Sequence, residues 1–443
     1  MTDTPNLPHP LDSREEPILY NLMTIRDDLT HLKQDRTTYV KSSDVMELYE
    51  RVVQQVNDLN EIRADKPQEQ NRVDRVLDGC FQLISLFFMT IGRNNDAPAA
   101  YALTSTIKRL LDHFTQVKLY SAKDLAHVTR TLENIKNIMN KESDYDAKLI
   151  TLLANRVTMC ESLLEELKVP LVRLQGHMPK LHETLISILR SLSLANTRSK
   201  FSTTEVTKLR KQGEEVAAQQ VDGKFVGEYG NVISGNEEVC ELLALVFQWS
   251  DIVLERKGVI PESFLPQYKT LVEIRNTLER ISLTQAWSLR ETDLYDYQRQ
   301  LDKIDESRVD YNFVDADGNF ADLYIQRTLL YLIRRSYGYI YYLMVSSEPV
   351  SEALLPVYNQ LQTLKRCLVE VQNSGGVASA RELYPYSMKL TSIESMRVDG
   401  KFMCGDEIPE GQGSVNDLLH ECYDISYELQ VAVANESEPE KGE

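Results

Sequence analysis

Residues 17–32, PILYNLMTIRDDLTHL, begin with proline and place apolar residues at steps of three and four, at Leu22, Ile25, Leu29 and Leu32. This spacing is that of one face of an α-helix. Proline suits the first helical turn because that turn has no use for the missing N–H, and the fixed φ of proline already matches a helix. The segment therefore predicts a helix that starts at Pro17.

The same pattern returns four times along the chain. The offsets after Pro266 and Pro356 are the same, and those after Pro98 and Pro179 are looser but still alternate steps of three and four. Successive prolines lie 81 to 90 residues apart. The sequence therefore predicts five tandem units of 81 to 90 residues.

Two further helices are expected in each unit, because cap-like patterns recur before two more apolar stripes. In such a box the Ser or Asn oxygen accepts an N–H of the first turn, and an acid three residues later returns the bond. Second helices are announced by Ser121-x-x-Asp124, Ser202-x-x-Glu205, Ser288-x-x-Glu291 and Ser379-x-x-Glu382. Third helices are announced by Asn71-x-x-Asp74, Ser143-x-x-Asp146, Ser234-x-x-Glu237, Asn319-x-x-Asp322 and Ser414-x-x-Asp417. The third helix is the most apolar of each set, so we expect it to be the buried centre.

These patterns predict an all-α fold of five tandem three-helix units, arranged as a solenoid or as a compact helical array. The expected organisation is a flexible leader (1–16), helical units at 17–97, 98–178, 179–265, 266–355 and 356–434, and an acidic disordered tail (435–443).

Composition excludes several classes of protein. The formal net charge of -18 repels nucleic-acid phosphates and anionic membranes, so neither is an expected partner. The six cysteines lie far apart and form no CxxC pair, which predicts reduced thiols. The proline-containing N-terminus, MTDTPNLPHP, lacks the apolar core of a signal peptide or anchor.

The run VDGKFVGEYGNVISGNEEVCELLALVFQWSDIVLERKG, residues 221–258, resembles a fungal family of uncharacterised proteins defined by a domain of unknown function. The resemblance covers most of the chain. It implies a soluble protein of cytoplasm and nucleus with no established enzymatic activity, and it supplies no site residues.

Common catalytic signatures are absent from the sequence: no GxxxxGK[ST] or GxGxxG phosphate loop, no GxSxG elbow and no HExxH helix. The spacing of Asp124 with His127, and of Asp417 with His420, is that of a di-iron motif, but both aspartates are expected helix caps. We therefore expect no catalytic residue, no metal ligand and no cofactor.

Cations supply the first candidate sites for a partner. Arg334 and Arg335 lie in a tyrosine-rich third helix; tyrosine and arginine favour binding hot spots, although tyrosines also fill gaps between helices. Each first helix also carries a central cation, at Arg26, Lys108, Arg190, Arg275 and Lys365. These cations, Arg275 and Lys365 above all, either line a shared groove for an anionic partner or pair with acids of their own unit.

Loops supply the remaining candidates. The pentapeptide VDGKF occurs at residues 221–225 and 398–402, each followed by a glycine-containing loop, and unit four has a shortened relative at 317–320. Asp-Gly favours a turn, and the phenylalanine can anchor the loop in the core. The long loops that follow are typical of binding segments or flexible connections. Lys224, Tyr229 and Lys401 are the candidate contact residues.

Two functions follow from these features. One is a non-catalytic helical scaffold or adaptor that mediates protein–protein interaction with a partner of unknown identity. The alternative is a binding module for a small anionic, phosphorylated ligand. An unrecognised enzyme is the third and least supported reading.

Overall fold

A computed structural model describes residues 8–64, 70–140, 145, 147–227, 230–285 and 288–437. Within these residues the chain forms fifteen α-helices and one two-stranded sheet, which confirms the all-α prediction. The helices of the first two predicted units are α1 (Glu16–Gln34), α2 (Ser42–Arg63), α3 (Arg72–Thr90), α4 (Ala100–Val117), α5 (Ala122–Asn140) and α6 (Ala147–Val172). Those of the third and fourth are α7 (Met178–Asn196), α8 (Thr203–Ala217), α9 (Asn236–Arg256), α10 (Leu265–Arg280), α11 (Leu294–Glu306) and α12 (Leu323–Val345). The fifth has α13 (Leu355–Asn373), α14 (Tyr384–Glu394) and α15 (Gln412–Ser437), with β1 (Arg397–Val398) and β2 (Lys401–Phe402) between the last two.

Short helical turns precede or follow several of these helices. They are the 3-10 turns η1 (Ser13–Glu15), η2 (Ala97–Ala99), η3 (Glu262–Phe264), η6 (Glu291–Asp293) and η7 (Ala380–Leu383), and the π-helical turn η4 (Ile281–Gln285).

All five prolines lie where helices begin, as predicted. Pro17, Pro179, Pro266 and Pro356 occupy the first turns of α1, α7, α10 and α13. Pro98 lies in η2, which runs directly into α4. Each proline therefore starts a helix without removing a needed N–H.

Only some of the cap-like patterns act as caps. Asn71 forms the complete capping box of α3, and Ser121 and Ser202 cap α5 and α8. Before α9, however, Gly235 takes the cap position and the Ser234 hydroxyl donates to the Arg173 carbonyl instead. Ser143 and Asp146, which define another such pattern, lie outside the described residues. Four-residue cap patterns thus locate a helix more reliably than they locate its first residue.

Burial of the third helices is uneven. In α3 and α12 most residues are buried, as expected for the centre of a three-helix unit. In α6 and α9 only one stripe is buried, and the opposite face is exposed. The prediction of a buried third helix is therefore correct for the first and fourth units and too strong for the second and third.

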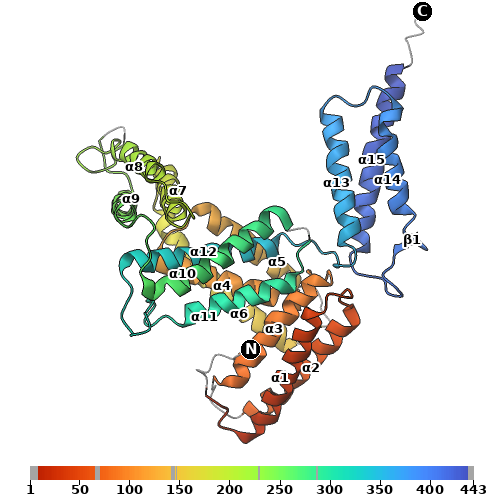
Figure 1. Ribbon diagram of the computed structural model, residues 1–443, viewed down its shortest axis with the longest axis horizontal. Helices are drawn as coiled ribbons and strands as arrows, with labels where there is room; N and C mark the ends of the chain where they lie inside the picture. The colour runs from red at the N-terminus through yellow and green to blue at the C-terminus, as the bar shows by residue number, and fades with distance from the viewer. Residues whose placement is uncertain are drawn as a thin grey trace, which may run out of the picture. The chain divides into compact units, whose positions relative to one another are not determined.

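The five units divide between two compact bodies, each described by itself. The terminal unit comprises Met1–Ala102, Gln285–Tyr295 and Ser346–Glu443, and the central unit comprises Leu103–Thr284 and Asp296–Val345. In the terminal unit, α1, α2 and α3 pack against one another, and α13 and α14 pack against α15 (Figure 1). In the central unit, α7, α8 and α9 form one three-helix group and α10 packs against α12.

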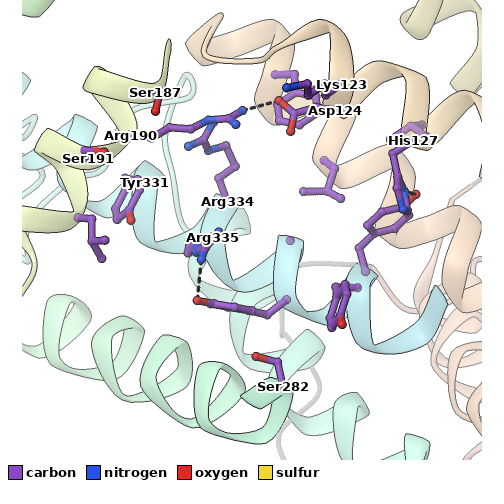
Figure 2. Close-up of a pocket in the computed structure, with 18 of the residues that line it drawn as sticks. Lys123, Asp124, His127, Ser187, Arg190, Ser191, Ser282, Tyr331, Arg334 and Arg335 are labelled. Carbon is purple, nitrogen blue, oxygen red and sulfur yellow. Dashed lines mark hydrogen bonds and ion pairs between the residues drawn. The ribbon is translucent and has the colours of Figure 1, made fainter. Parts of the chain in front are cut away.

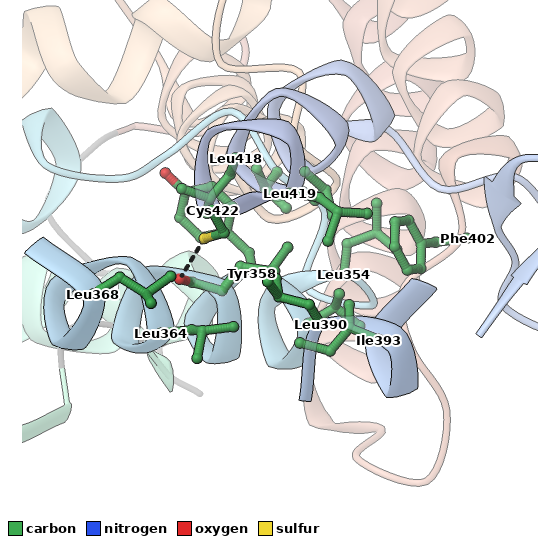
Figure 3. Packing of buried hydrophobic residues seen from close by; sticks show 14 of the residues in the cluster. Leu354, Tyr358, Leu364, Leu368, Leu390, Ile393, Phe402, Leu418, Leu419 and Cys422 are labelled. Atoms are coloured by element: carbon green, nitrogen blue, oxygen red, sulfur yellow. Dashed lines mark hydrogen bonds between the residues drawn. The ribbon is translucent and has the colours of Figure 1, made fainter. Parts of the chain in front are cut away.

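The fifth three-helix group shows how such a core is built (Figure 3). Leu361, Leu368 and Leu390 are completely buried among residues of α13, α14 and α15. The Cys422 thiol donates a hydrogen bond to the Leu361 carbonyl at 3.5 Å, and burial raises the pKa of this thiol to about 11. Cys422 therefore behaves as a small apolar residue, and all six cysteines of the chain are free thiols.

A two-residue hairpin recurs before the third helix of the last three units. The second and third residues of a V-D-x-x-F pentapeptide have positive φ, and the first and fourth residues pair across the turn. The copies are residues 221–225, 309–313 and 398–402. Glycine at the third position, Gly223 and Gly400, adopts this conformation without steric cost.

The hairpin phenylalanine anchors each turn, as predicted for the two VDGKF copies. Phe225, Phe313 and Phe402 are at most 2% exposed. An amide side chain at the start of the third helix accepts the backbone N–H of each phenylalanine, at 2.8 to 3.0 Å; the three amides are Asn236, Gln326 and Gln412. The copy in the fourth unit is VDYNF at 309–313, so its assignment to residues 317–320 was wrong. Those residues belong to a second turn, closed by the backbone pair of Val314 and Phe320.

Both ends of the chain depart from the expected organisation. Glu15 is buried, and its carboxylate accepts hydrogen bonds from Arg63 and Asn71, so the folded part of the chain begins before Pro17. At the other end α15 extends to Ser437, and residues 438–443 lie outside the described part. None of the helices in the described residues has the length and apolarity needed to span a bilayer.

Candidate functional site

A cavity of about 720 Å³ lies in the central unit, between helices from three of the predicted three-helix units (Figure 2). Its walls come from α4, α5, α7 and α12 and from the π-helical turn η4. This volume is within the range of drug-sized ligand sites. It is the site described below as the arginine cavity.

Helix α12 contributes more of the described lining residues than any other element. Tyr331, Arg334, Arg335, Tyr339 and Tyr342 all line the cavity, and steps of three and four keep such residues on one side of a helix. The predicted pair of arginines in a tyrosine-rich helix therefore does face a cavity.

Arg334 lies deep in this wall and is only 8% exposed. Its guanidinium donates to the Leu119 backbone carbonyl, and Arg190 of α7 donates to the same oxygen at 3.3 Å. Burial first, and then the charge of Arg190, lowers the pKa of Arg334 to about 10. Two guanidinium groups thus converge on one carbonyl oxygen.

Asp124 is the acid that offsets part of this charge. Its carboxylate pairs with Arg190 and also accepts the Ser121 backbone N–H at 2.7 Å, as the acid of the α5 capping box. Burial alone would raise the pKa of the Asp124 carboxyl, but the hydrogen bond and charge of Arg190, with the Ser121 bonds, leave this pKa below its ordinary value. Asp124 therefore stays ionised and is already paired.

The other two cations of the cavity differ from each other. Lys123 pairs with the carboxylate of Glu183. Arg335 instead donates to the Tyr339 hydroxyl at 2.8 Å, with its guanidinium 4.4 Å from the centre of the tyrosine ring. Within the described residues, neither Arg334 nor Arg335 has a carboxylate within ion-pair distance. The cavity therefore keeps two cations without a directly paired carboxylate, although the Tyr339 hydroxyl that accepts from Arg335 donates in turn to Glu279 at 2.8 Å.

Histidine and tyrosine close another side of the cavity. The Tyr341 hydroxyl lies 2.7 Å from both His127 Nδ1 and Thr131 Oγ1. Asp124 and His127, whose spacing resembles a metal motif, thus have separate protein partners. Among the described residues, no group of three His, Cys, Asp or Glu side chains is placed to hold a metal ion.

The remaining predicted cations are elsewhere. Arg275 is 4% exposed, and its guanidinium donates to the Thr197 carbonyl and hydroxyl, so it holds α10 against the end of α7 rather than lining a groove. Lys365 lies on α13 in the terminal unit and pairs with Glu421 of α15 at 2.7 Å. Of the five central cations, Arg190 alone lines the arginine cavity.

The predicted loop residues lie at the hairpins. Lys224 and Lys401 occupy the fourth position of their turns, where they are exposed and pair through the backbone with Val221 and Val398. Tyr229 lies outside the described residues. Neither Lys224 nor Lys401 lines the arginine cavity.

Sequence reasoning missed the contribution of η4. This π-helical turn follows α10 directly and places Ser282 and Leu283 in the cavity wall, with Leu283 78% exposed. Single π-helical turns are frequent at functional sites. The spacing of apolar residues does not distinguish such a turn from a continued α-helix. The position of Leu283 in the cavity wall could therefore not be predicted from the sequence.

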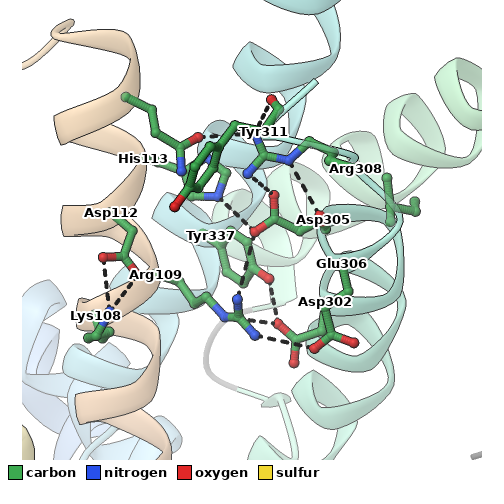
Figure 4. A network of polar contacts seen from close by, with 12 residues as sticks. Lys108, Arg109, Asp112, His113, Asp302, Asp305, Glu306, Arg308, Tyr311 and Tyr337 are labelled. Atoms are coloured by element: carbon green, nitrogen blue, oxygen red, sulfur yellow. Dashed lines mark hydrogen bonds and ion pairs between the residues drawn. The ribbon is translucent and has the colours of Figure 1, made fainter. Parts of the chain in front are cut away.

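A second group of charges in the central unit is compensated (Figure 4). The Arg308 side chain, 5% exposed, pairs with Asp305 at 2.7 Å, and His113 lies 3.3 Å from the same carboxylate. Arg109 lies within 4 Å of the carboxylates of Asp302, Asp305 and Glu306. Each arginine of this network therefore has an acidic partner.

Comparison with protein families gives one match, to a protein of unknown function (DUF2408), at residues 171–291 and 347–441. The two matched segments contain the VDGKF hairpins of the third and fifth units. The equivalent hairpin at 309–313 lies between them, which marks the fourth unit as a third copy of this structural element.

Two fungal proteins are similar along nearly the whole chain. The CUB1 family protein C30C2.08 of Schizosaccharomyces pombe is 36% identical over 431 residues, covering 95% of this chain and 94% of the relative. Cu(2+) suppressing and bleomycin sensitive protein 1 of Saccharomyces cerevisiae is 34% identical over 509 residues, covering 96% of this chain and 91% of the relative. No solved structure matches the chain. The resemblance expected from residues 221–258 is thereby confirmed: this chain belongs to the same fungal family as these two proteins, a family that carries a domain of unknown function.

Proposed function

We propose that the protein is a non-catalytic binding module that holds a small anionic ligand in the arginine cavity of its central unit. One observation carries the proposal: Arg334 is buried beside Arg190, and Asp124, the one carboxylate among the described residues of the cavity wall, is paired with Arg190. A buried cation without a counter-ion is costly, and an anionic ligand would remove that cost.

The setting of the cavity supports this choice. The whole chain has a formal charge of -18, yet the cavity gathers Lys123, Arg190, Arg334 and Arg335 around one aspartate. A concentration of positive charge inside an acidic protein attracts small anions locally while the remaining surface repels nucleic acid. The proposal therefore assigns no nucleic-acid partner.

Binding rather than catalysis is proposed because the polar groups in the wall hydrogen-bond to structural partners. His127 bonds to Tyr341, and the Ser282 hydroxyl donates to the Glu279 carbonyl. A nucleophile and a general base would instead lie within hydrogen-bond reach of each other. The arrangement therefore suits the binding of an anion better than catalysis.

Thermal unfolding with inorganic phosphate, pyrophosphate and sulfate tests the proposal. An anion at a concentration of ten times its dissociation constant should raise the free energy of unfolding of the protein by about 1.4 kcal/mol. The effect should disappear in Arg334→Met and persist in Lys365→Ala, a matched removal of a cation that already has an acidic partner. Equal stabilisation of both variants would place the anion elsewhere and reject the cavity.

The adaptor hypothesis remains a second candidate, favoured by one recurrent feature. The first residue of each hairpin is an exposed valine: Val221 is 56% exposed, Val309 49% and Val398 59%. Three apolar side chains at equivalent positions suit contact with a protein partner. Replacing all three by threonine should keep the turns and abolish copurification of a stoichiometric partner; retained copurification would reject the hairpin valines as contact residues.

Location and metal binding are separate matters. We propose a location in cytoplasm and nucleus, as the family resemblance implies, and fluorescence imaging of a tagged chain would test it. The Saccharomyces cerevisiae relative has Cu(2+) in its name. We carry no property of that name over to this chain.

A further inference from the structure

We propose that the ligand of the arginine cavity is a phosphate monoester with an aromatic ring, of the nucleoside monophosphate class, held with its phosphate inward and its ring at the mouth. This inference rests on the proposed function, and it adds the number of phosphates, the ring and the orientation.

The count of charges favours one phosphate. Four cations line the cavity, but Lys123 pairs with Glu183 and Arg190 pairs with Asp124. Two positive charges, on Arg334 and Arg335, remain for the ligand. A phosphate monoester carries between one and a half and two negative charges near neutral pH, roughly the charge that is needed. A triphosphate would bring additional negative charge into a partly desolvated place beside Asp124, where it would be opposed.

The two ends of the cavity differ in exposure, which orients the ligand. Arg334 and Tyr331 are each 8% exposed and form the deep end. Tyr342 is 54% exposed and Leu283 is 78% exposed, and both also line the cavity. A ring bound at the mouth would bury the exposed apolar surface there, which favours binding. A phosphate bound at the deep end would form charge-assisted hydrogen bonds with the buried guanidinium.

Aromatic side chains at the mouth favour a planar ring over an aliphatic chain. Tyr342 supplies one exposed ring, and Tyr339 supplies another on which the Arg335 guanidinium already stacks. Bases stack on tyrosine rings and on arginine guanidinium planes with little dependence on the base. The cavity volume of about 720 Å³ accommodates a group of this size.

Isothermal titration of the full chain with a matched series of probes tests the inference. The probes are the 5′-monophosphates of adenosine, guanosine, cytidine and uridine, with ribose 5-phosphate lacking the base, adenosine lacking the phosphate, and ATP with added charge. At least one monophosphate should bind tenfold or more tightly than ribose 5-phosphate, adenosine and ATP.

Variants separate the two ends of the ligand. Tyr342→Ala and Leu283→Ser are exposed changes that should fold normally, and should weaken the best monophosphate about tenfold while leaving ribose 5-phosphate unchanged. Arg334→Met should abolish binding of both. Arg335→Ala provides a second, exposed test of the phosphate end, and should weaken both to a similar extent.

The outcomes distinguish this inference from the proposed function. Monophosphates that bind no more tightly than ribose 5-phosphate would overturn the ring, and ATP binding most tightly would overturn the single phosphate; either leaves an anion site in place. A phosphotyrosine peptide, titrated in the same way as a different aromatic phosphate monoester, would also overturn the nucleotide class if it bound at least tenfold more tightly than every monophosphate. Failure of every anion to bind in an Arg334-dependent way would overturn both proposals.

Discussion

Arg334 and Arg308 lie in the same compact unit and are buried to a similar degree, but their charges are balanced differently. Arg308 pairs with Asp305 at 2.7 Å, and its neighbour Arg109 lies among three carboxylates. Arg334 has a backbone carbonyl and a second arginine as its neighbours, and burial lowers its pKa to about 10. The charge of Arg308 is neutralised by carboxylates of the protein. The charge of Arg334 has no directly paired carboxylate and is available to an anionic ligand.

The comparison teaches how a functional arginine can be told from a structural one. Removal of one partner of a buried ion pair strongly lowers stability, because the other charge is then left buried without compensation. A buried cation without an acid costs stability in the free protein, which is the typical signature of a binding site that has been optimised for its ligand. The two arginines should therefore respond oppositely to the same substitution.

The largest effect is expected at the compensated network. Arg308→Met leaves the Asp305 carboxylate, 8% exposed, without its closest cation, and should lower the free energy of unfolding by about 3 kcal/mol. Urea denaturation of the full chain, followed by helical circular dichroism, measures this loss. A neutral result would show that Arg109 and His113 suffice for Asp305, and would remove the contrast with Arg334.

Arg334→Met should act in the opposite direction and by less. Replacing an uncompensated guanidinium by an apolar side chain of similar length should raise the free energy of unfolding by about 1 kcal/mol, while abolishing stabilisation by phosphate. The same denaturation experiment, with and without phosphate, gives both values. Destabilisation comparable to that of Arg308→Met would mean that Arg334 is structural.

Alkaline pH provides a third test, because the pKa of Arg334 is lowered to about 10. A base with a depressed folded pKa lowers stability while it is charged, and the cost disappears as pH rises from that value toward 12.5, its ordinary pKa. The stability advantage of Arg334→Met over the unchanged protein should thus stay constant up to about pH 9 and shrink as the pH rises above about 10. Phosphate affinity should fall over the same interval; pH-independent affinity through pH 11 would exclude Arg334 as the phosphate ligand.

The smallest effect is expected at a half-buried cation that has its own acid. Lys365 pairs with Glu421, whose side chain is 54% exposed, so Lys365→Ala should change the free energy of unfolding by at most about 0.5 kcal/mol. Phosphate binding should not change. A measurable loss of anion affinity would revive the groove formed by the central cations of the first helices.

Helix positions were largely predictable because their signals are local. Proline at the first turn and apolar steps of three and four depend on a few neighbouring residues, and all five prolines begin helices. Cap positions were less predictable, since Ser234 has an alternative partner in the Arg173 carbonyl across a loop. The choice between two such acceptors depends on tertiary contacts.

The hairpins show how far a motif can be recognised without structure. The repeated VDGKF identified two of them, because Asp-Gly specifies the turn and phenylalanine its anchor. The third copy, at 309–313, was missed because Tyr311 occupies the glycine position and adopts a φ of 64°. Burial of Phe313 and the hydrogen bonds of Gln326 hold this less favourable residue in place.

The sequence by itself determined the helical class, the five proline-marked units and the row of tyrosines and arginines along α12, because each depends on spacing along one segment. Only the tertiary structure decided which of these cations has an acid beside it. Asp124 lies 66 residues before Arg190 in sequence, and Leu119 lies 215 residues before Arg334. The energy of a charge depends on its burial and on the distance to its neighbours, and neither quantity is encoded in the spacing of residues along one helix.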